Sequence, residues 1–311
     1  MSKKKVVGTG GELLMHQLVA QGVEYAFTNT GSAEAGFFDA FLTVPGVQPI
    51  LLLAESLVLS AADGYAKASG KTAFVNVHLA AGTRQGSGQL QNAYFDGSPM
   101  VVTAAMRDTG TFGDHNTLGA SAGFSQMGAV QDITKKRWEV LDARGIPLAT
   151  RRAFKEAMTM PTGPVYLAFS SPALDAKGVE GTIQAAHGLE MAQVPGGSTI
   201  EKIHDALLNA ERPLLVVGPD VRTAGAYREM LELSENYSLP TTVGFHDYGA
   251  FPQKHPNYIG MIDNIPEDGY DVVCCVGYRQ NTRAGPKDHK FTDAGTIIGI
   301  GHDPAVMGNT F

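Results

Sequence analysis

The stretch from Pro49 to Met106 constrains the fold more than any other part of the chain. Its three apolar runs cover residues 50–54, 72–78 and 99–105, and two segments with helical spacing separate them. Gly70 is placed to end the first of these segments, and residues 80–88 are expected to form a glycine-rich turn. Short continuous apolar runs are typical of strands that are buried on both faces of a parallel sheet. The order strand, helix, strand, helix, strand therefore predicts an α/β fold with a doubly wound parallel sheet.

A carboxylate and an imidazole follow two of these strands. Glu55 comes directly after the apolar run 50–54, and His78 ends the run 72–78. The carboxyl ends of strands carry the chemistry in open parallel sheets. We expect Glu55 to be poorly solvated there, and therefore able to share a proton with a ring nitrogen. An acidic residue at this point also fits a helix cap, so both interpretations stay open.

The remaining segments predict two α/β domains. The first covers residues 1–180, in which 25–28 and 163–169 read as further strands. Residues 181–198 contain Gly and Pro without any periodicity, which is typical of a linker. Residues 199–311 repeat the alternation of strands and helices, and this predicts a second, apparently shortened, Rossmann-like domain.

Composition narrows the classes of partner and compartment. The net charge of −7 and the charged content of 18% argue against nucleic acid and anionic membranes as partners. No apolar run approaches the roughly 20 residues of a membrane-spanning helix, and no signal-peptide core is evident. The adjacent Cys274 and Cys275 lie in an apolar run and read as buried thiols. A cytoplasmic location is the expectation.

Glu55 and the segments 28–32, 62–71 and 76–83 form several motifs in a fixed order. Together they resemble the pyrimidine-binding domain of thiamine-diphosphate (ThDP) enzymes. This superfamily includes benzoylformate decarboxylase, pyruvate decarboxylase and acetolactate synthase. The resemblance extends over most of residues 10–310. It implies a pyrimidine-binding domain followed by a Rossmann-like middle domain.

The resemblance gives Glu55 and His78 specific roles. The equivalent of Glu55 in these enzymes hydrogen-bonds the aminopyrimidine ring of the cofactor and promotes its imino form. A carboxylate suits this role because it can exchange a proton with a ring nitrogen. The equivalent of His78 in benzoylformate decarboxylases faces the substrate and relays protons. A histidine that satisfies backbone groups at the strand end is the structural alternative.

The resemblance also assigns residues in two loops. Ser32 stands where benzoylformate decarboxylases bind the substrate carboxylate, but it fits a helix cap equally well. Thr30 occupies a position where Pro is common in the family. The positions expected to line the cofactor, besides Glu55, are Asn29, Thr30, Gly31 and Gly82.

Further histidines bear on the substrate. His115 begins a segment, 115–119, that resembles the His-His-Thr-Leu-Gly segment of pyruvate and indolepyruvate decarboxylases. It could reach the site or lie on the surface. Benzoylformate decarboxylases present another active-site His near the segment 277–283, which contains none here. The remaining histidines lack metal-ligand spacing, so no metal is expected to bind this chain directly.

The family pattern implies a cofactor that this chain does not hold alone. Family members bind the diphosphate of ThDP through Mg²⁺ with a Gly-Asp-Gly motif followed by Asn, and this motif is absent here. We therefore expect a second subunit that carries it, in a hetero-oligomer built on dimers, or a chain that is a fragment of a longer one.

The expected reaction is decarboxylation of a small 2-oxo acid, or C–C bond formation or cleavage with an aldehyde. An acetolactate synthase-like enzyme, a 2-hydroxyacyl-CoA lyase-like enzyme and a non-catalytic regulatory subunit are the alternatives.

Overall fold

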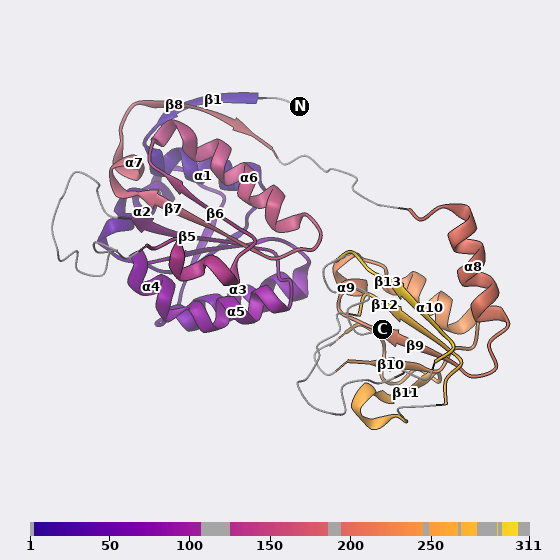
Figure 1. Cartoon of the computed structure of the whole chain (residues 1–311). Helices are drawn as coiled ribbons and strands as arrows, with labels where there is room; N and C mark the ends of the chain where they lie inside the picture. The colour runs from indigo at the N-terminus through magenta and orange to yellow at the C-terminus, as the bar shows by residue number, and fades with distance from the viewer. Residues whose placement is uncertain are drawn as a thin grey trace. The chain divides into compact units, whose positions relative to one another are not determined.

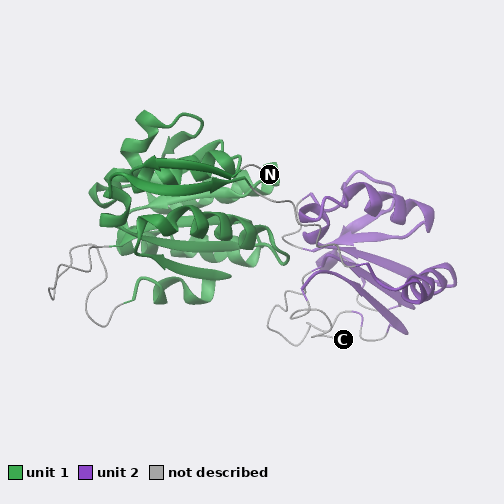
Figure 2. Cartoon of the chain, turned by 90° about the horizontal axis from the view of Figure 1, so that it is seen from above, with its two compact units in different colours: residues 1–190 green, residues 191–311 purple. Residues whose placement is uncertain are grey.

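The computed structural model of the chain describes residues 3–106, 125–185, 194–244, 249–266, 269–278, 291 and 294–303. Its contacts divide the chain into two compact units, residues 1–190 and 191–311, which Figure 2 colours separately. Each unit contains one parallel sheet, and the elements are labelled in Figure 1.

Unit 1 is built on a six-stranded sheet in the order β3-β2-β4-β5-β7-β6. All neighbouring strands in this sheet run parallel. The strands are β2 (Tyr25–Asn29), β3 (Gln48–Leu51), β4 (Ala73–Val77), β5 (Met100–Met106), β6 (Lys136–Val140) and β7 (Pro164–Ser170). Two more strands, β1 (Lys3–Gly8) and β8 (Val179–Gln184), form a separate antiparallel ribbon.

Helices cover both faces of this sheet (Figure 1). On one face lie α1 (Gly10–Ala20), α2 (Ala35–Thr43), α6 (Ile146–Met158) and α7 (Ser171–Asp175). On the other face lie α3 (Glu55–Ser69) and α5 (Ser87–Phe95), and both contact α4 (Leu79–Gln85). Three short 3-10 helices complete the described part of the unit, η1 (Ser32–Glu34), η2 (Gly128–Ile133) and η3 (Ala143–Gly145). Two hydrophobic cores result, one on each side of the sheet.

The helix α3 forms where the sequence predicts it. Its buried residues Val58, Leu59, Ala62 and Ala66 follow helical spacing and face the sheet. Gly70 ends it with φ at 69°, a left-handed conformation that glycine adopts without steric cost. The sequence therefore predicted both the helix and its end at Gly70.

Three other segments differ from the expectation. Residues 80–88 were expected to form a glycine-rich turn, but they belong to α4 and α5. Residues 130–160 carry helical patterns in the sequence, but they include the edge strand β6. Residues 181–184, assigned to the linker, form the second half of β8. Gly86 allows close packing there, since a Cβ at this position would lie 2.9 Å from Leu59 Cδ2.

Unit 2 holds a five-stranded parallel sheet in the order β11-β10-β9-β12-β13. Its strands are β9 (Pro213–Val217), β10 (Thr241–Val243), β11 (Tyr258–Met261), β12 (Val272–Val276) and β13 (Thr296–Ile300). The described helices are α8 (Gly197–Leu208), α9 (Asp220–Thr223), α10 (Tyr227–Asn236) and the 3-10 helix η4 (Ile262–Asn264). The predicted α/β class with two parallel-sheet domains is confirmed.

The two cysteines lie in β12, an inner strand of this second sheet. Cys274 and Cys275 are both buried in β12 and form no disulfide, as predicted. Burial raises the pKa of each thiol to about 12. Within the described ranges, none of the helices is long and apolar enough to cross a membrane.

Candidate active site

The carboxyl ends of three neighbouring strands bring most of the predicted site residues to one edge of the first sheet. In the sheet register Thr28 of β2 pairs with Leu51 of β3, and Asn29 of β2 pairs with Val77 of β4. The three strands therefore end side by side. Glu55, the loop 30–32 and His78 follow these strands and meet at the same edge.

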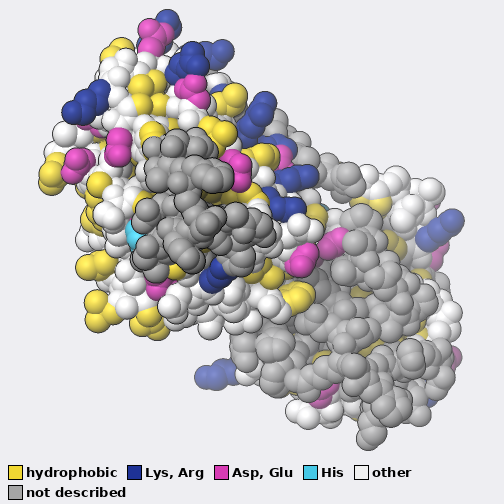
Figure 3. Space-filling model, turned by 60° about the vertical axis from the view of Figure 1, so that its left-hand side comes forward, with side chains coloured by type: hydrophobic (Ala, Val, Ile, Leu, Met, Phe, Trp, Pro, Cys, Tyr) yellow, Lys and Arg dark blue, Asp and Glu magenta, His cyan; other side chains and the backbone are white. Residues whose placement is uncertain are grey.

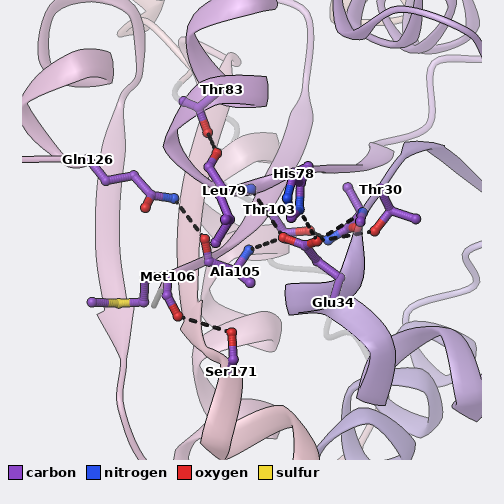
Figure 4. Close-up of polar contacts among 12 residues, drawn as sticks. Thr30, Glu34, His78, Leu79, Thr83, Thr103, Ala105, Met106, Gln126 and Ser171 are labelled. Atoms are coloured by element: carbon purple, nitrogen blue, oxygen red, sulfur yellow. Dashed lines mark hydrogen bonds and ion pairs between the residues drawn. The ribbon is translucent and has the colours of Figure 1, made fainter. Parts of the chain in front are cut away.

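Glu34, which is not among the predicted site residues, forms the polar centre of this edge. Its side chain is fully buried. One carboxylate oxygen accepts hydrogen bonds from the backbone N–H groups of Leu79 (3.1 Å) and Ala105 (2.9 Å). The other accepts from the backbone N–H of Gly31 (3.1 Å) and the hydroxyl of Thr30 (3.4 Å). These donors, shown in Figure 4, compensate for the loss of water around a buried charge.

A sequence signal for Glu34 existed. It lies three residues after Gly31, the residue that precedes the short helix η1. At this spacing a glutamate side chain reaches back to the backbone N–H at the start of a helix. The pattern predicts the contact with Gly31, but not the contacts with Leu79 of α4 and Ala105 of β5, which are far away in the sequence.

His78 is held by Glu34. Its Nδ1 lies 2.7 Å from the second carboxylate oxygen of Glu34, and its side chain is 18% exposed. Because an ionised carboxylate only accepts hydrogen bonds, Nδ1 is the donor in this contact, and Nε2 is the ring nitrogen that takes no part in it. The face of the ring packs on Gly31, where a Cβ would lie 2.6 Å from His78 Cε1. The partner of the ring is thus a carboxylate, not the backbone groups that the structural alternative supposed.

The backbone after His78 is strained. Leu79 is buried and adopts φ at 50°, which is unusual for a residue other than glycine. Its N–H points to Glu34, and the carbonyl of His78 accepts from the N–H of Gly82 at 2.7 Å. Such strain persists only where the surrounding contacts fix it, and it is concentrated at functional sites.

Glu55 is the first residue of α3 and does not cap it. The N-cap is Ala54, without any side-chain cap, so the capping interpretation of Glu55 is wrong. Glu55 is half-buried, which is more exposed than we expected. A Cβ on Gly82 would lie 3.0 Å from Glu55 Oε1, so the carboxylate rests against the backbone of α4. No group in the described part of the chain forms a hydrogen bond or ion pair with this carboxylate.

The other predicted residues vary in how they relate to this edge. Asn29 and Thr30 are half-buried at the end of β2. Ser32 is exposed and begins η1, whose N-cap is Gly31 without a side-chain cap, so the hydroxyl of Ser32 caps nothing. His115 lies outside the described residues, as do positions 279–283.

A second network of buried hydrogen bonds involves α4 through Thr83 (Figure 4). Thr83 donates its hydroxyl proton to the carbonyl of Leu79 at 2.8 Å. Tyr166 is 2.7 Å from both Thr83 Oγ1 and Gln126 Nε2. Thr83 has a single hydroxyl proton and gives it to Leu79, so the phenol of Tyr166 donates to Thr83 and accepts from the amide of Gln126. Burial raises the pKa of Tyr166 to about 12, which keeps this donor neutral.

Metal ligands do not gather in the part of the chain that the structure describes. No group of three or more His, Cys, Asp and Glu side chains is placed there to hold a metal ion.

Comparison with known protein families identifies both units. Residues 8–131 match the family model of the thiamine pyrophosphate enzyme N-terminal TPP-binding domain. Residues 200–311 match the model of the thiamine pyrophosphate enzyme central domain. Thiamine pyrophosphate is another name for ThDP. The two matched domains follow one another in the predicted order.

Curated relatives come from two branches of this family. Benzoylformate decarboxylase of Pseudomonas aeruginosa is 33% identical over 271 residues, which is 82% of this chain and 49% of the relative. The large subunit of acetolactate synthase isozyme 3 of Escherichia coli is 26% identical over 313 residues, covering 97% of this chain and 54% of the relative. The chain thus spans about half the length of the curated relatives it matches.

Solved structures agree with the sequence comparison. A ThDP-dependent 4-hydroxybenzoylformate decarboxylase of Rhodococcus jostii RHA1 is similar over 97% of this chain and 58% of its own, with a TM-score of 0.84 and 25% identity. A putative ThDP-dependent enzyme of Mycobacterium smegmatis has a TM-score of 0.77 and 28% identity over 88% of this chain and 53% of its own. From its two matched domains and these relatives, the chain belongs to the superfamily of thiamine diphosphate-dependent enzymes.

Proposed function

We propose that this chain provides the pyrimidine-binding side of a ThDP active site. The reaction would be decarboxylation of a 2-oxo acid, or the making or breaking of a C–C bond next to a carbonyl group. The observation that carries the proposal is the edge formed by Glu55, Gly82 and His78, in which a carboxylate with no partner in the described part of the chain lies beside a fixed imidazole.

The residues at this edge fit the cofactor. Glycine at positions 31 and 82 leaves the space that a Cβ would take, against His78 in one case and Glu55 in the other. ThDP, when bound, supplies the electron sink for the carbanion chemistry. Glu55 would hydrogen-bond a ring nitrogen of the pyrimidine and exchange a proton with it. Asn29, Thr30 and Gly31 would line the ring from the neighbouring strand.

His78 would handle protons on the substrate side. Its contact with Glu34 fixes the ring and leaves Nε2 as the nitrogen that accepts or returns a proton. The exposed hydroxyl of Ser32 would bind the substrate carboxylate. His115 stays a further candidate from the sequence alone.

The surface around Glu55 supports a partner. Leu51, Leu53 and Leu57 flank Glu55 along the chain and are 69%, 90% and 53% exposed. On the face of the first unit that Figure 3 shows, hydrophobic side chains lie interspersed with charged ones. Grouped exposed apolar side chains mark interaction surfaces. We propose that a second subunit with a Gly-Asp-Gly…Asn motif docks here and brings the diphosphate and Mg²⁺, in a hetero-oligomer built on dimers.

A carboligase is the second candidate. The acetolactate synthase large subunit of Escherichia coli aligns with 97% of this chain, whereas the benzoylformate decarboxylase of Pseudomonas aeruginosa aligns with 82%. Both reactions would use the same pyrimidine side of the cofactor. They would differ in whether a proton or a second carbonyl compound takes up the carbanion.

The test is to reconstitute the chain with a protein that carries the diphosphate-binding motif. We would assay benzoylformate and pyruvate with ThDP and Mg²⁺, and follow both aldehyde and acyloin products. Glu55→Gln should lower turnover by about 10²-fold or more, because the carboxyl proton is lost from the exchange. Glu24→Gln, which changes an exposed carboxylate remote from this edge, is the matched control.

His78→Ala separates the two sides of the site. It should reduce turnover by about 10²-fold while the affinity for ThDP, measured by calorimetry, changes little. Turnover of Glu55→Gln at the wild-type rate would remove Glu55 from the mechanism and with it the proposed function.

A further inference from the structure

A large pocket lies at the amino ends of the strands of the first sheet, on the side opposite to Glu55. Its volume is about 830 Å³, within the range of about 300–1,000 Å³ that is usual for sites of small organic ligands. It is formed where α1, α3 and α6 end and where the β1–β8 ribbon begins and ends. Val23 and Thr72 in its lining precede β2 and β4, so the pocket faces away from the edge of Glu55.

The charged side chains that line the pocket are all basic, namely Lys3, Lys71, Arg151, Arg152 and Lys155. Two of them have carboxylate partners, Lys71 with Glu24 at 2.7 Å and Lys155 with Glu156 at 2.9 Å. Arg151 hydrogen-bonds the neutral side chain of Gln184. No carboxylate in the described part of the chain pairs with Lys3, Arg151 or Arg152, so three positive charges lack a compensating charge.

Helix ends account for only part of this charge. The pocket lies at the carboxyl ends of α1, α3 and α6, each of which carries roughly half a negative elementary charge. Basic residues commonly lie near such ends for this reason. Three ends together would offset about one and a half charges, so a net positive charge remains for a ligand.

The walls of the pocket are largely apolar and include two aromatic rings, Tyr65 and Phe154. The ring of Tyr65 is fixed by edge-on contact with Tyr25 at 5.8 Å and tilted contact with Phe27 at 5.5 Å between ring centroids. Phe154 is 7% exposed and belongs to the core. Rigid rings beside basic side chains suit a flat ring that bears negative charge.

We propose that this pocket binds a small organic polyanion that contains an aromatic ring, the chemical class of nucleoside di- and triphosphates. A ligand with several negative charges matches three uncompensated basic groups better than a monocarboxylate does. The guanidinium groups of Arg151 and Arg152 offer the forked donors that phosphates accept. The site is distinct from the Glu55 edge and does not depend on the function proposed there.

The test is isothermal titration of the full chain with ADP. We expect saturable binding of one ADP per chain, weakened by added salt because the interaction is electrostatic. Adenosine lacks the charge and inorganic tripolyphosphate lacks the ring, so each should bind about tenfold or more weakly than ADP.

Arg152→Glu should lower the affinity for ADP by about tenfold or more, because it places a negative charge beside the negatively charged phosphates. Lys177→Glu makes the same charge change at an exposed site outside the pocket and should leave the affinity within about twofold. Both sites are exposed, so folding is retained, and circular dichroism checks it.

The proposal is overturned if ADP does not saturate, or if tripolyphosphate binds as tightly as ADP. It is also overturned if Arg152→Glu keeps the wild-type affinity. Loss of ADP binding in Glu55→Gln but not in Arg152→Glu would place ADP at the other edge and equally refute the proposal.

Discussion

Replacing Glu34 by Gln tests the buried centre of the candidate site most directly. The substitution keeps the size and shape of the side chain, but it replaces one carboxylate oxygen with an NH₂ group. One oxygen of Glu34 accepts from the N–H groups of Leu79 and Ala105. The other faces Gly31, Thr30 and His78. Whichever way the amide turns, its NH₂ group meets at least two donors.

The expected loss follows from these contacts. A buried donor that loses its acceptor costs about 1–3 kcal/mol, and two are lost at minimum. The amide would turn its NH₂ group toward Thr30 and Gly31, which are half-buried and can relax toward water. We therefore expect the free energy of unfolding of the first unit to fall by about 2–4 kcal/mol.

Urea unfolding followed by tryptophan fluorescence measures this loss. The chain contains a single tryptophan, Trp138, which lies in β6 of the first unit and so reports on that unit. Glu24→Gln is the control, since Glu24 is exposed and pairs with Lys71 at the surface. It should leave the unfolding curve close to that of the wild type. If Glu34→Gln shifted the free energy of unfolding by no more than about 0.5 kcal/mol, the hydrogen-bonding role of Glu34 would be refuted.

Three further predictions concern other buried positions. Gly82→Ala places a Cβ 3.0 Å from Glu55 Oε1 and should lower the affinity for ThDP measured by calorimetry. Circular dichroism should show that the fold is intact. An unchanged affinity would contradict the contact between Gly82 and Glu55. Tyr166 keeps its proton in the native state up to a pKa of about 12, above the ordinary value of about 10. The contribution of the protonated phenol to the stability of the fold is thus full below about pH 10 and is lost toward pH 12. The difference in unfolding free energy between the wild type and Tyr166→Phe should therefore narrow from pH 9 to 11. A constant difference would contradict this prediction. Cys274 and Cys275, with pKa values of about 12, should react with a thiol reagent at pH 8 only after unfolding, and fast native labelling would show that they are accessible.

Local patterns in the chain predicted the elements whose causes are local. The apolar runs predicted the central strands β4 and β5, because strands buried on both faces need apolar residues throughout. The helix α3 and its end at Gly70 followed from spacing and from the conformational freedom of glycine. Glu55 and His78 were identifiable because each follows a strand within a family motif.

Only the tertiary structure decided which groups meet. β1 and β8 pair as an antiparallel ribbon in which Lys3 lies opposite Gln184. The sequence of either strand alone does not indicate which distant strand it pairs with. Glu34 reaches the N–H of Ala105 across 71 positions of the chain. A short carboxylate motif predicts a contact within one helical turn, but it does not state which distant backbone donors the fold will bring to it.

Sequence periodicity predicted the class of the fold, because backbone geometry repeats every few residues. The family was indicated by the resemblance of ordered motifs around Glu55 and His78, and the matched family models show it. The parallel sheet determined the site, because it lines up strand ends that are far apart in the chain at one edge. That alignment determines the hydrogen bonds of Glu34 and the position of His78. It also determines the contact of the Glu55 carboxylate with Gly82. A buried charge needs donors from several elements at once, and only the folded chain supplies them together.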